Sequence, residues 1–247
     1  MNLKSIYKIL IYKLMKDERD YFIFKISESN LKLNDENIIS IVKQMNNKNY
    51  FIGCFQNLNC FKTITPILKN EFSLKTPLSK NNEKLKKNIL ETRNSVFLHI
   101  RRGDYLTNNN YCFVKLGAGY YNGALRIIKE RLDNPHIFVF SNDIEFCKNN
   151  LIKSLDSNII KNMEFSFIEG NDEGNASEEM ELMKMCQNAI IANSTFSWWA
   201  AYLMDNKNKI VITPSAFFYD DTNPKVKHIL PKDWIVIDYI WGMEIKL

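Results

Sequence analysis

In the second half of the chain, short apolar runs rich in β-branched and aromatic residues alternate with segments whose apolar positions recur at helical period. The predicted strands are VFLHI (96–100), IFVFS (137–141), EFSFI (164–168), AIIAN (189–193) and KIVIT (209–213). The predicted helices cover residues 120–132, 144–154, 178–187 and 194–204. Repeated alternation of strand and helix is typical of a parallel sheet with crossover helices. We therefore predict an α/β fold with a Rossmann-type parallel sheet.

The pattern is weaker before residue 95. It predicts helices near 3–15, 35–46, 58–70 and 79–92, and strands at YFIFKI (21–26) and YFIGCF (50–55). Thr76-Pro77 and the Lys/Asn-rich stretch after it are typical of a passage between two lobes. We therefore predict a small N-terminal lobe at 1–94 and a larger C-terminal lobe at 95–247.

Three predicted strands run directly into polar residues. The first continues as HIRRGDY (99–105), the second ends in SND (141–143), and the fourth leads into NSTFSWW (193–199). The carboxyl ends of parallel strands lie at one edge of a sheet, which is where ligands bind. We expect the three segments to form one site.

HIRRGDY places two arginines, Arg101 and Arg102, at a strand end. Gly103 lets the backbone turn, and Asp104 can orient a guanidinium. The planar fork of arginine pairs two phosphate oxygens at once and keeps its charge at cellular pH. The pattern favours a diphosphate ligand. The alternative is a purely structural ion pair between Arg102 and Asp104.

In NSTFSWW, Asn193 and Ser194 are favourable N-cap residues, so a helix is expected to begin there with free N–H groups directed at the same edge. Such a helix start binds anions, and the hydroxyls of Ser194, Thr195 and Ser197 would add donors. The alternative is that these residues only cap the helix. We interpret the two tryptophans that follow as core residues, with one of them bordering the cleft as the alternative.

The acidic stretch EGNDEGNASEEM (169–180) follows the third strand. Glu178 and Glu179 suit the start of a helix electrostatically and need no further role there. A carboxylate at this edge would also hold a sugar hydroxyl or a guanine edge.

GAGYYNG (117–123) resembles the glycine-rich turn of dinucleotide-binding proteins, with Asp143 about twenty residues later. Its third glycine is displaced by one position, so we disfavour a nicotinamide or flavin cofactor. The sequence has no Gly-x-x-x-x-Gly-Lys-Ser/Thr loop and no Asp-x-Asp pair for a divalent cation, and its three histidines are far apart. We expect neither a metal nor a bound cofactor.

The composition narrows the class of partner. With 247 residues and 45% hydrophobic content, the chain is expected to fold as one large domain or two small ones. Lys and Arg number 33 against 28 Asp and Glu, without a basic block, which favours a small anionic ligand over nucleic acid. Five scattered cysteines favour a reducing cytoplasm. We read residues 6–15 as a soluble helix; a helix lying on the inner membrane face is the alternative.

Five segments together resemble the alpha-1,2-fucosyltransferases of glycosyltransferase family eleven, which use GDP-L-fucose as donor. They are YFIGCFQN (50–57), HIRRGDY, LGAGYYNGAL (116–125), FVFSNDIEFCKNNL (138–151) and EEMELMKMCQNAIIANSTFSWWAAYL (178–203). The resemblance implies a GT-B-like pair of lobes, with 1–94 on the acceptor side. It also implies metal-independent, inverting transfer of fucose from GDP-beta-L-fucose to the 2-hydroxyl of a terminal galactoside, in surface glycan or lipopolysaccharide synthesis.

The resemblance also implies roles for individual residues. Arg101 and Arg102 match the arginines that hold the donor diphosphate, and Asp104 completes the catalytic set. The donor contacts expected beside them are His99, Asp143, Glu179, Asn193, Ser194, Thr195 and Ser197.

The sequence departs from the family pattern in two places. The family normally opens with a Gly-Gly-Leu-Gly-Asn-Gln loop, which does not occur here, so the first lobe is expected to be incomplete. Gln187 and Asn188 replace basic or histidine residues. Two alternatives therefore stay open: a GDP-sugar-binding protein with weak or no transfer activity, and a transferase for another GDP-sugar.

Overall fold

The computed structural model of the chain describes residues 22–25, 49–52, 58, 64–106, 113–171, 173–219 and 229–246. The chain divides into two compact units, Met1–Thr63 and Ile64–Leu247. In the first unit, β1 (Phe22–Lys25) and β2 (Asn49–Ile52) form a parallel pair, which confirms both predicted strands. The helices expected near 3–15 and 35–46 lie outside the described residues.

The second unit contains a six-stranded, entirely parallel sheet in the order β5-β4-β3-β6-β7-β8. Its strands are β3 (Ser95–Ile100), β4 (His136–Ser141), β5 (Glu164–Phe167), β6 (Asn188–Ile190), β7 (Val211–Pro214) and β8 (Ile235–Ile237). Counted along this unit the order is 3-2-1-4-5-6, the doubly wound order that places a ligand crevice where the direction of winding reverses. That reversal lies between β3 and β6. The predicted Rossmann-type sheet is confirmed, and β8 is an additional strand that the sequence pattern did not predict.

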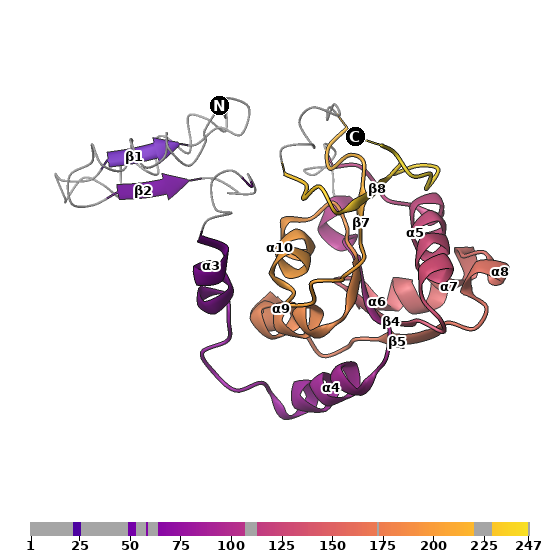
Figure 1. The fold of residues 1–247 in the computed structure, drawn as a ribbon, viewed down its shortest axis with the longest axis horizontal. Helices are drawn as coiled ribbons and strands as arrows, with labels where there is room; N and C mark the ends of the chain where they lie inside the picture. The colour runs from indigo at the N-terminus through magenta and orange to yellow at the C-terminus, as the bar shows by residue number, and fades with distance from the viewer. Residues whose placement is uncertain are drawn as a thin grey trace. The chain divides into compact units, whose positions relative to one another are not determined.

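Helices cover both faces of this sheet, with α9 and α10 on one side and α5, α7 and α8 on the other (Figure 1). Their bounds are α3 (Thr65–Glu71), α4 (Lys80–Glu91), α5 (Ala118–Arg131), α6 (Ile144–Phe146), the π-helical turn Cys147–Leu151, α7 (Ile152–Ser154), α8 (Ser157–Ile160), α9 (Ala176–Met185) and α10 (Thr195–Leu203). Every residue of β3 is buried. A central strand of a parallel sheet is covered on both faces, which is why β3 is mainly apolar, with Ser95 and His99 as its buried polar residues.

The glycines of GAGYYNG have a packing role in this structure. A Cβ atom at Gly119 would lie 1.8 Å from the carbonyl oxygen of Ile240, and one at Gly123 would lie 2.1 Å from that of Gly242. The turn that approaches α5 is held by Asp238, whose Oδ1 accepts hydrogen bonds from the backbone N–H groups of Ile240 and Trp241 at 2.9 and 2.7 Å. The glycines therefore let the turn after β8 pack directly on α5.

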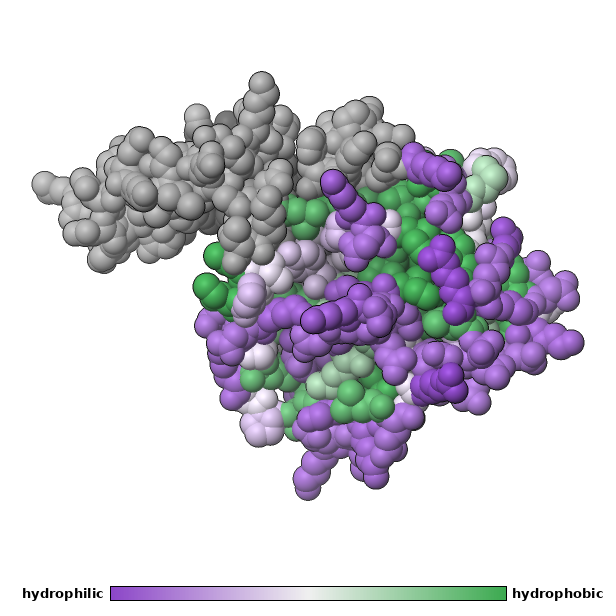
Figure 2. All heavy atoms as spheres, in the orientation of Figure 1, coloured by the Kyte–Doolittle hydropathy of each residue, from purple (hydrophilic) through white to green (hydrophobic). Residues whose placement is uncertain are grey.

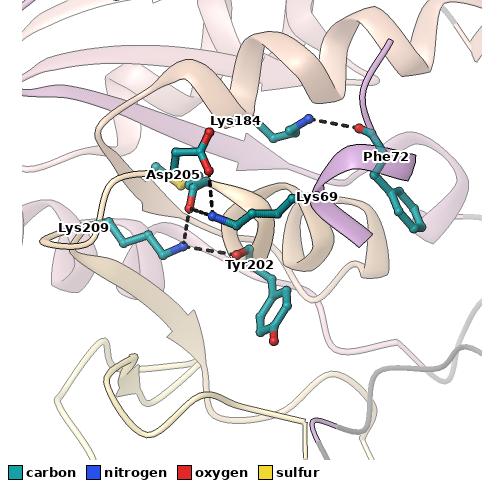
Figure 3. Close-up of polar contacts among 7 residues, drawn as sticks. Lys69, Phe72, Lys184, Tyr202, Asp205 and Lys209 are labelled. Carbon is teal, nitrogen blue, oxygen red and sulfur yellow. Dashed lines mark hydrogen bonds and ion pairs between the residues drawn. The ribbon is translucent and has the colours of Figure 1, made fainter. Parts of the chain in front are cut away.

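Helix α3 packs on α10 within the second unit (Figure 3). The ring of Phe72, the residue after α3, stacks on Trp199 with centroids 5.3 Å apart. Lys69 Nζ lies 2.7 Å from Asp205 Oδ1, and Lys184 Nζ donates a 3.0 Å hydrogen bond to the carbonyl of Phe72. Lys209 Nζ also donates to carbonyls at the C-terminal end of α10. Since cations favour a helix C-terminus, Lys69 and Lys209 stabilise the end of α10, while Lys184 links α9 to the end of α3.

The tandem tryptophans thus have different packing roles. Trp198 is fully buried, and its indole N–H donates a 2.8 Å hydrogen bond to the carbonyl of Ile229. Trp199 is half-buried under α3. The prediction of a core residue is confirmed for Trp198, whereas Trp199 packs against the end of the neighbouring helix α3.

The surface of the second unit is mainly hydrophilic on the face drawn in Figure 2, with apolar residues gathered between polar ones. Large apolar side chains that are exposed include Ile240, Trp241 and Met243 in the turn after β8. Among the described residues, no helix is both long enough and apolar enough to cross a membrane. The expected boundary between functional lobes at 94/95 stays a prediction.

Candidate active site at the crevice between two central strands

The segments after β3 and β6 meet, as expected from their adjacent parallel strands. The hydroxyl of Tyr105 donates a 3.0 Å hydrogen bond to the carbonyl of Asn193. The rings of His99 and Phe196 lie 5.8 Å apart. HIRRGDY and NSTFSWW, nearly a hundred residues apart in sequence, therefore form one continuous rim at the topological switch point.

Arg102 is held from two sides by residues that follow β4. Its guanidinium carbon lies 3.4 Å from the ring centroid of Phe146, a close cation–π contact. Its Nε lies 3.3 Å from Oδ2 of Asp143, but this buried nitrogen has no partner in hydrogen-bond geometry. Asp143 also caps α6 by accepting a hydrogen bond from the backbone N–H of Phe146. In this structure Asp143 thus has two partners within the chain, and its predicted contact with the nucleotide stays a prediction.

Asn142 shapes the turn after β3. Its Oδ1 accepts hydrogen bonds from the backbone N–H groups of Arg102 at 3.0 Å and Gly103 at 3.3 Å. A Cβ atom at Gly103 would lie 2.9 Å from the Asn142 Nδ2 atom, so a side chain at position 103 would displace this amide. The SND segment therefore fixes both the backbone and the side chain of the second arginine. The side chain of Asp104 lies outside the described part of the structure, so its catalytic role stays a prediction.

The two arginines follow the end of β3 and have different protein partners. Arg102 contacts residues of α6, whereas the charge of Arg101 acts on His99 and on Glu179 of α9. The guanidinium carbon of Arg101 also lies 6.0 Å from the ring centroid of Tyr105. Both arginines nevertheless line one hollow beside α5.

Two neighbouring glutamates on α9 have opposite pKa shifts. Backbone and side-chain hydrogen bonds from Ser79 and Asn82 lower the pKa of Glu178, whose carboxylate links α9 to the start of α4. Burial raises the pKa of Glu179 to about 7, although Arg101 opposes the rise. Glu179 is thus a carboxyl group able to accept or release a proton near neutral pH.

His99 is almost fully buried, with 2% of its surface exposed, and its Nδ1 has no hydrogen-bond partner. Burial, assisted by the charge of Arg101, lowers its pKa to about 3. The imidazole is therefore neutral at physiological pH. It packs beneath the rim, and a direct contact with the donor would require its surroundings to open.

This burial predicts a loss of stability in mild acid. Between the folded pKa of about 3 and the unfolded value of 6.5, the unfolded chain binds a proton that the folded chain does not. Above pH 6.5 the His99 imidazole is neutral in both states and costs no stability. At pH 5 the proton that only the unfolded chain binds should lower the free energy of unfolding by about 2 kcal/mol. The raised pKa of Glu179 acts in the opposite direction over the same pH range, because the folded chain then holds a proton that the unfolded chain releases. The contribution of His99 is therefore the difference between the parent chain and His99→Gln, each measured by urea unfolding at pH 7.5 and pH 5.

His99→Gln should show a smaller loss between those two pH values than the parent chain. His136→Gln is the matched control, because His136 is only partly buried and Glu164 opposes the lowering of its pKa. An equal acid dependence in His99→Gln and the parent would contradict the prediction.

The start of α10 is built as a capped helix. Ser194 accepts a hydrogen bond from the backbone N–H of Phe196, and Thr195 is exposed at the first helical position. Ser197 is fully buried and donates to carbonyls of its own turn, while the side-chain amide of Asn193 donates to the carbonyls of Val114 and Phe217. In this structure the polar groups of Asn193 and Ser197 thus bond to the backbone inside the rim, and their predicted contact with the donor stays a prediction.

A hollow of about 120 Å³ lies between the end of β3, the start of α5 and the π-helical turn. It is lined by Ile100, Arg101, Arg102, Tyr105, Leu106, Lys115, Leu116, Gly117, Ala118, Tyr121, Phe146, Leu151 and Ser154. Among these, the sequence pattern predicts a site role only for the two arginines. No motif marked Lys115 or Phe146, although Phe146 lies within a segment that the family resemblance covers and Lys115 directly precedes another.

Comparison with known proteins gives a consistent family. A family model described as "Glycosyl transferase family 11" matches residues 3–238. An alpha-1,2-colitosyltransferase of Escherichia coli is 37% identical over 175 residues, which is 68% of this chain and 56% of that protein.

Two further relatives extend the comparison. The O-antigen biosynthesis glycosyltransferase WbnK of Escherichia coli is 36% identical over 143 residues, 57% of this chain and 45% of that protein. Galactoside alpha-(1,2)-fucosyltransferase 2 of Rattus norvegicus is 31% identical over 110 residues, 44% of this chain and 29% of that protein. The chain therefore spans about half or less of the length of these relatives.

Proposed function

The chain belongs to glycosyl transferase family 11, and on that premise we propose that it transfers L-fucose from GDP-beta-L-fucose to the 2-hydroxyl of a terminal galactoside. The names of relatives that are alpha-1,2-fucosyltransferases support the linkage. The name of an O-antigen biosynthesis relative supports a role in lipopolysaccharide synthesis, and hence a reaction at the cytoplasmic face of the membrane.

The observation that carries this proposal is the rim between β3 and β6, where the segment that holds Arg101 and Arg102 meets the segment that leads into α10. Cations and free helix N–H groups stabilise the negative charge that grows on a departing diphosphate. We assign residues 95–247 to the donor-binding lobe of a GT-B-type enzyme and residues 1–94 to its acceptor side.

In the proposed mechanism, the fucosyl carbon leaves GDP with oxocarbenium character while the arginines stabilise the diphosphate. The galactoside hydroxyl attacks from the opposite face, which inverts the configuration at that carbon. The single proton of that hydroxyl is proposed to pass to Glu179, with Asp104 as the alternative acceptor. The pKa of about 7 suits Glu179 to that role at neutral pH.

Transfer is expected to continue undiminished in excess EDTA, because arginine side chains supply the positive charge that a divalent cation supplies in other enzymes. Initial rates would be measured with EDTA, with added Mg²⁺ and with added Mn²⁺, alongside a metal-dependent glycosyltransferase as a positive control. A rate lost in EDTA and restored by either cation would rule out metal-independent transfer.

A donor screen tests the function itself. GDP-fucose, GDP-mannose and UDP-galactose would each be incubated with lactose and N-acetyllactosamine, and the product linkage determined by NMR. An alpha-1,2-fucosylated product from GDP-fucose alone supports the proposal. Binding of GDP without transfer from any donor would favour the alternative of a non-catalytic GDP-sugar-binding protein.

The similarity to an alpha-1,2-colitosyltransferase favours a second candidate donor, GDP-colitose. Colitose is fucose without its 3-hydroxyl, so a site that hydrogen-bonds that hydroxyl would discriminate against it. Adding GDP-colitose to the screen separates the two functions by the ratio of their kcat/KM values.

A further inference from the structure

The hollow beside α5 brings together three cationic side chains. Arg101 and Arg102 come from the end of β3, and Lys115 comes from the segment that leads into α5. The other residues that line it are apolar, aromatic or hydroxyl-bearing, and none of them is an acid. The lining residues therefore carry a net positive charge, although Asp143 lies 3.3 Å from Arg102 Nε, and a small anion of high charge density is the ligand that the hollow fits best.

The backbone on either side of Lys115 is fixed. Val114 is fully buried; its N–H donates to the carbonyl of Phe217 at 3.2 Å, and its own carbonyl accepts from the side-chain amide of Asn193 at 2.9 Å. Phe113 stacks on Tyr105 with ring centroids 4.2 Å apart. The lysine side chain itself is exposed. A rigid backbone thus carries a solvent-accessible ammonium to the edge of the hollow.

The start of α5 adds to the positive charge around the hollow. Gly117, its N-cap residue, makes no side-chain cap, and the first turn contains no acidic residue. Gly117 and Ala118 line the hollow, so the unsatisfied N–H groups of the first turn lie close to the three cations. The positive end of the α5 helix dipole adds to the positive charge of the three side chains.

We propose that Lys115 binds the distal phosphate of the nucleoside diphosphate, with Arg102 on the other side of that phosphate. The assignment rests on the proposed function, since it concerns the same donor. Asn193 then has a definite role, because its amide holds the carbonyl of Val114 and so fixes the segment that presents the lysine. Lys115 is a recognition residue for the terminal phosphate, distinct from groups that contact the base or ribose.

The test compares GDP with GMP, which lacks the distal phosphate. Isothermal titration calorimetry of Lys115→Met is expected to show GDP binding weakened about tenfold or more, because a charge-assisted contact is lost. GMP binding should change by less than about a factor of two, because the contact that is lost involves only the distal phosphate. Lys129→Met, the same substitution near the other end of α5, is the matched control and should bind both nucleotides like the parent.

The outcomes separate the two proposals. If the parent chain binds GDP and Lys115→Met binds it equally well, the assignment of Lys115 is overturned while the proposed function stands. An equal weakening of GDP and GMP also overturns it, since the lysine would then contact the proximal phosphate or act on the fold. If the parent binds neither GDP nor GDP-fucose, the proposed function itself fails.

Discussion

Replacement of Arg102 by alanine is expected to lower kcat/KM for the donor by roughly 10²- to 10⁴-fold, since a preorganised cation at a departing diphosphate contributes about 3 to 5 kcal/mol to transition-state stabilisation. Phe146 and Asp143 hold the guanidinium in place before the donor arrives, so little reorganisation is needed during the reaction. Initial rates over a range of GDP-fucose concentrations would separate the effects on kcat and KM.

Arg102→Lys should recover only part of the lost activity, because an ammonium keeps the charge but lacks the planar fork. Arg126→Ala, which removes an exposed arginine from α5, is the control for net charge and should leave transfer unchanged. The folded state should tolerate Arg102→Ala, since the Arg102–Asp143 pair is one-third exposed on each side and such pairs stabilise little. Wild-type turnover in the alanine variant would remove Arg102 from the mechanism.

Gly123→Ala is expected to lower the free energy of unfolding by an amount on the order of 3 kcal/mol. The added Cβ would lie 2.1 Å from the carbonyl oxygen of Gly242 and 2.5 Å from its Cα, so the turn after β8 would have to move away. Helix propensity alone predicts the opposite, because alanine favours a helix interior by about 1 kcal/mol over glycine. The midpoint of urea unfolding decides between the two.

Gly117→Ala is the matched control, since no atom lies within 4 Å of the Cβ that it would add. It should lower the free energy of unfolding by at most about 1 kcal/mol, the usual cost of alanine at an N-cap. A Gly123→Ala variant as stable as the parent would show that the turn after β8 does not pack closely on α5 in solution.

The sheet was predictable from sequence because its strands are long enough to show their period and end in residues that differ from the core. β3 and β4 have six residues each, and the polar residues after them mark the carboxyl edge. β8 has only three residues, too few for a period to be counted, and its pairing with β7 depends on tertiary structure. The sequence pattern around β8 therefore did not distinguish this strand from a loop.

The sequence pattern predicted where the candidate site lies, but not which contacts its side chains make. Residue type identified Ser197 and Asn193 as hydrogen-bonding groups, but type alone does not tell whether a hydroxyl or amide faces a ligand or its own backbone. Lys115 and Phe146 carried no motif, because a single lysine or phenylalanine between apolar residues is common in any core or surface. Their relevance depends on the spatial proximity of α5, β3 and the segment after β4.

The packing of the turn after β8 on α5 bears on how a nascent chain folds. Residues 235–243 are synthesised long after α5, so on the ribosome the glycine face of that helix and the outer edge of β7 stay uncovered until late. Open strand edges and exposed apolar surface attract other chains. Overproduction of this protein should therefore benefit from chaperones that bind unfinished chains and from slow translation at low temperature.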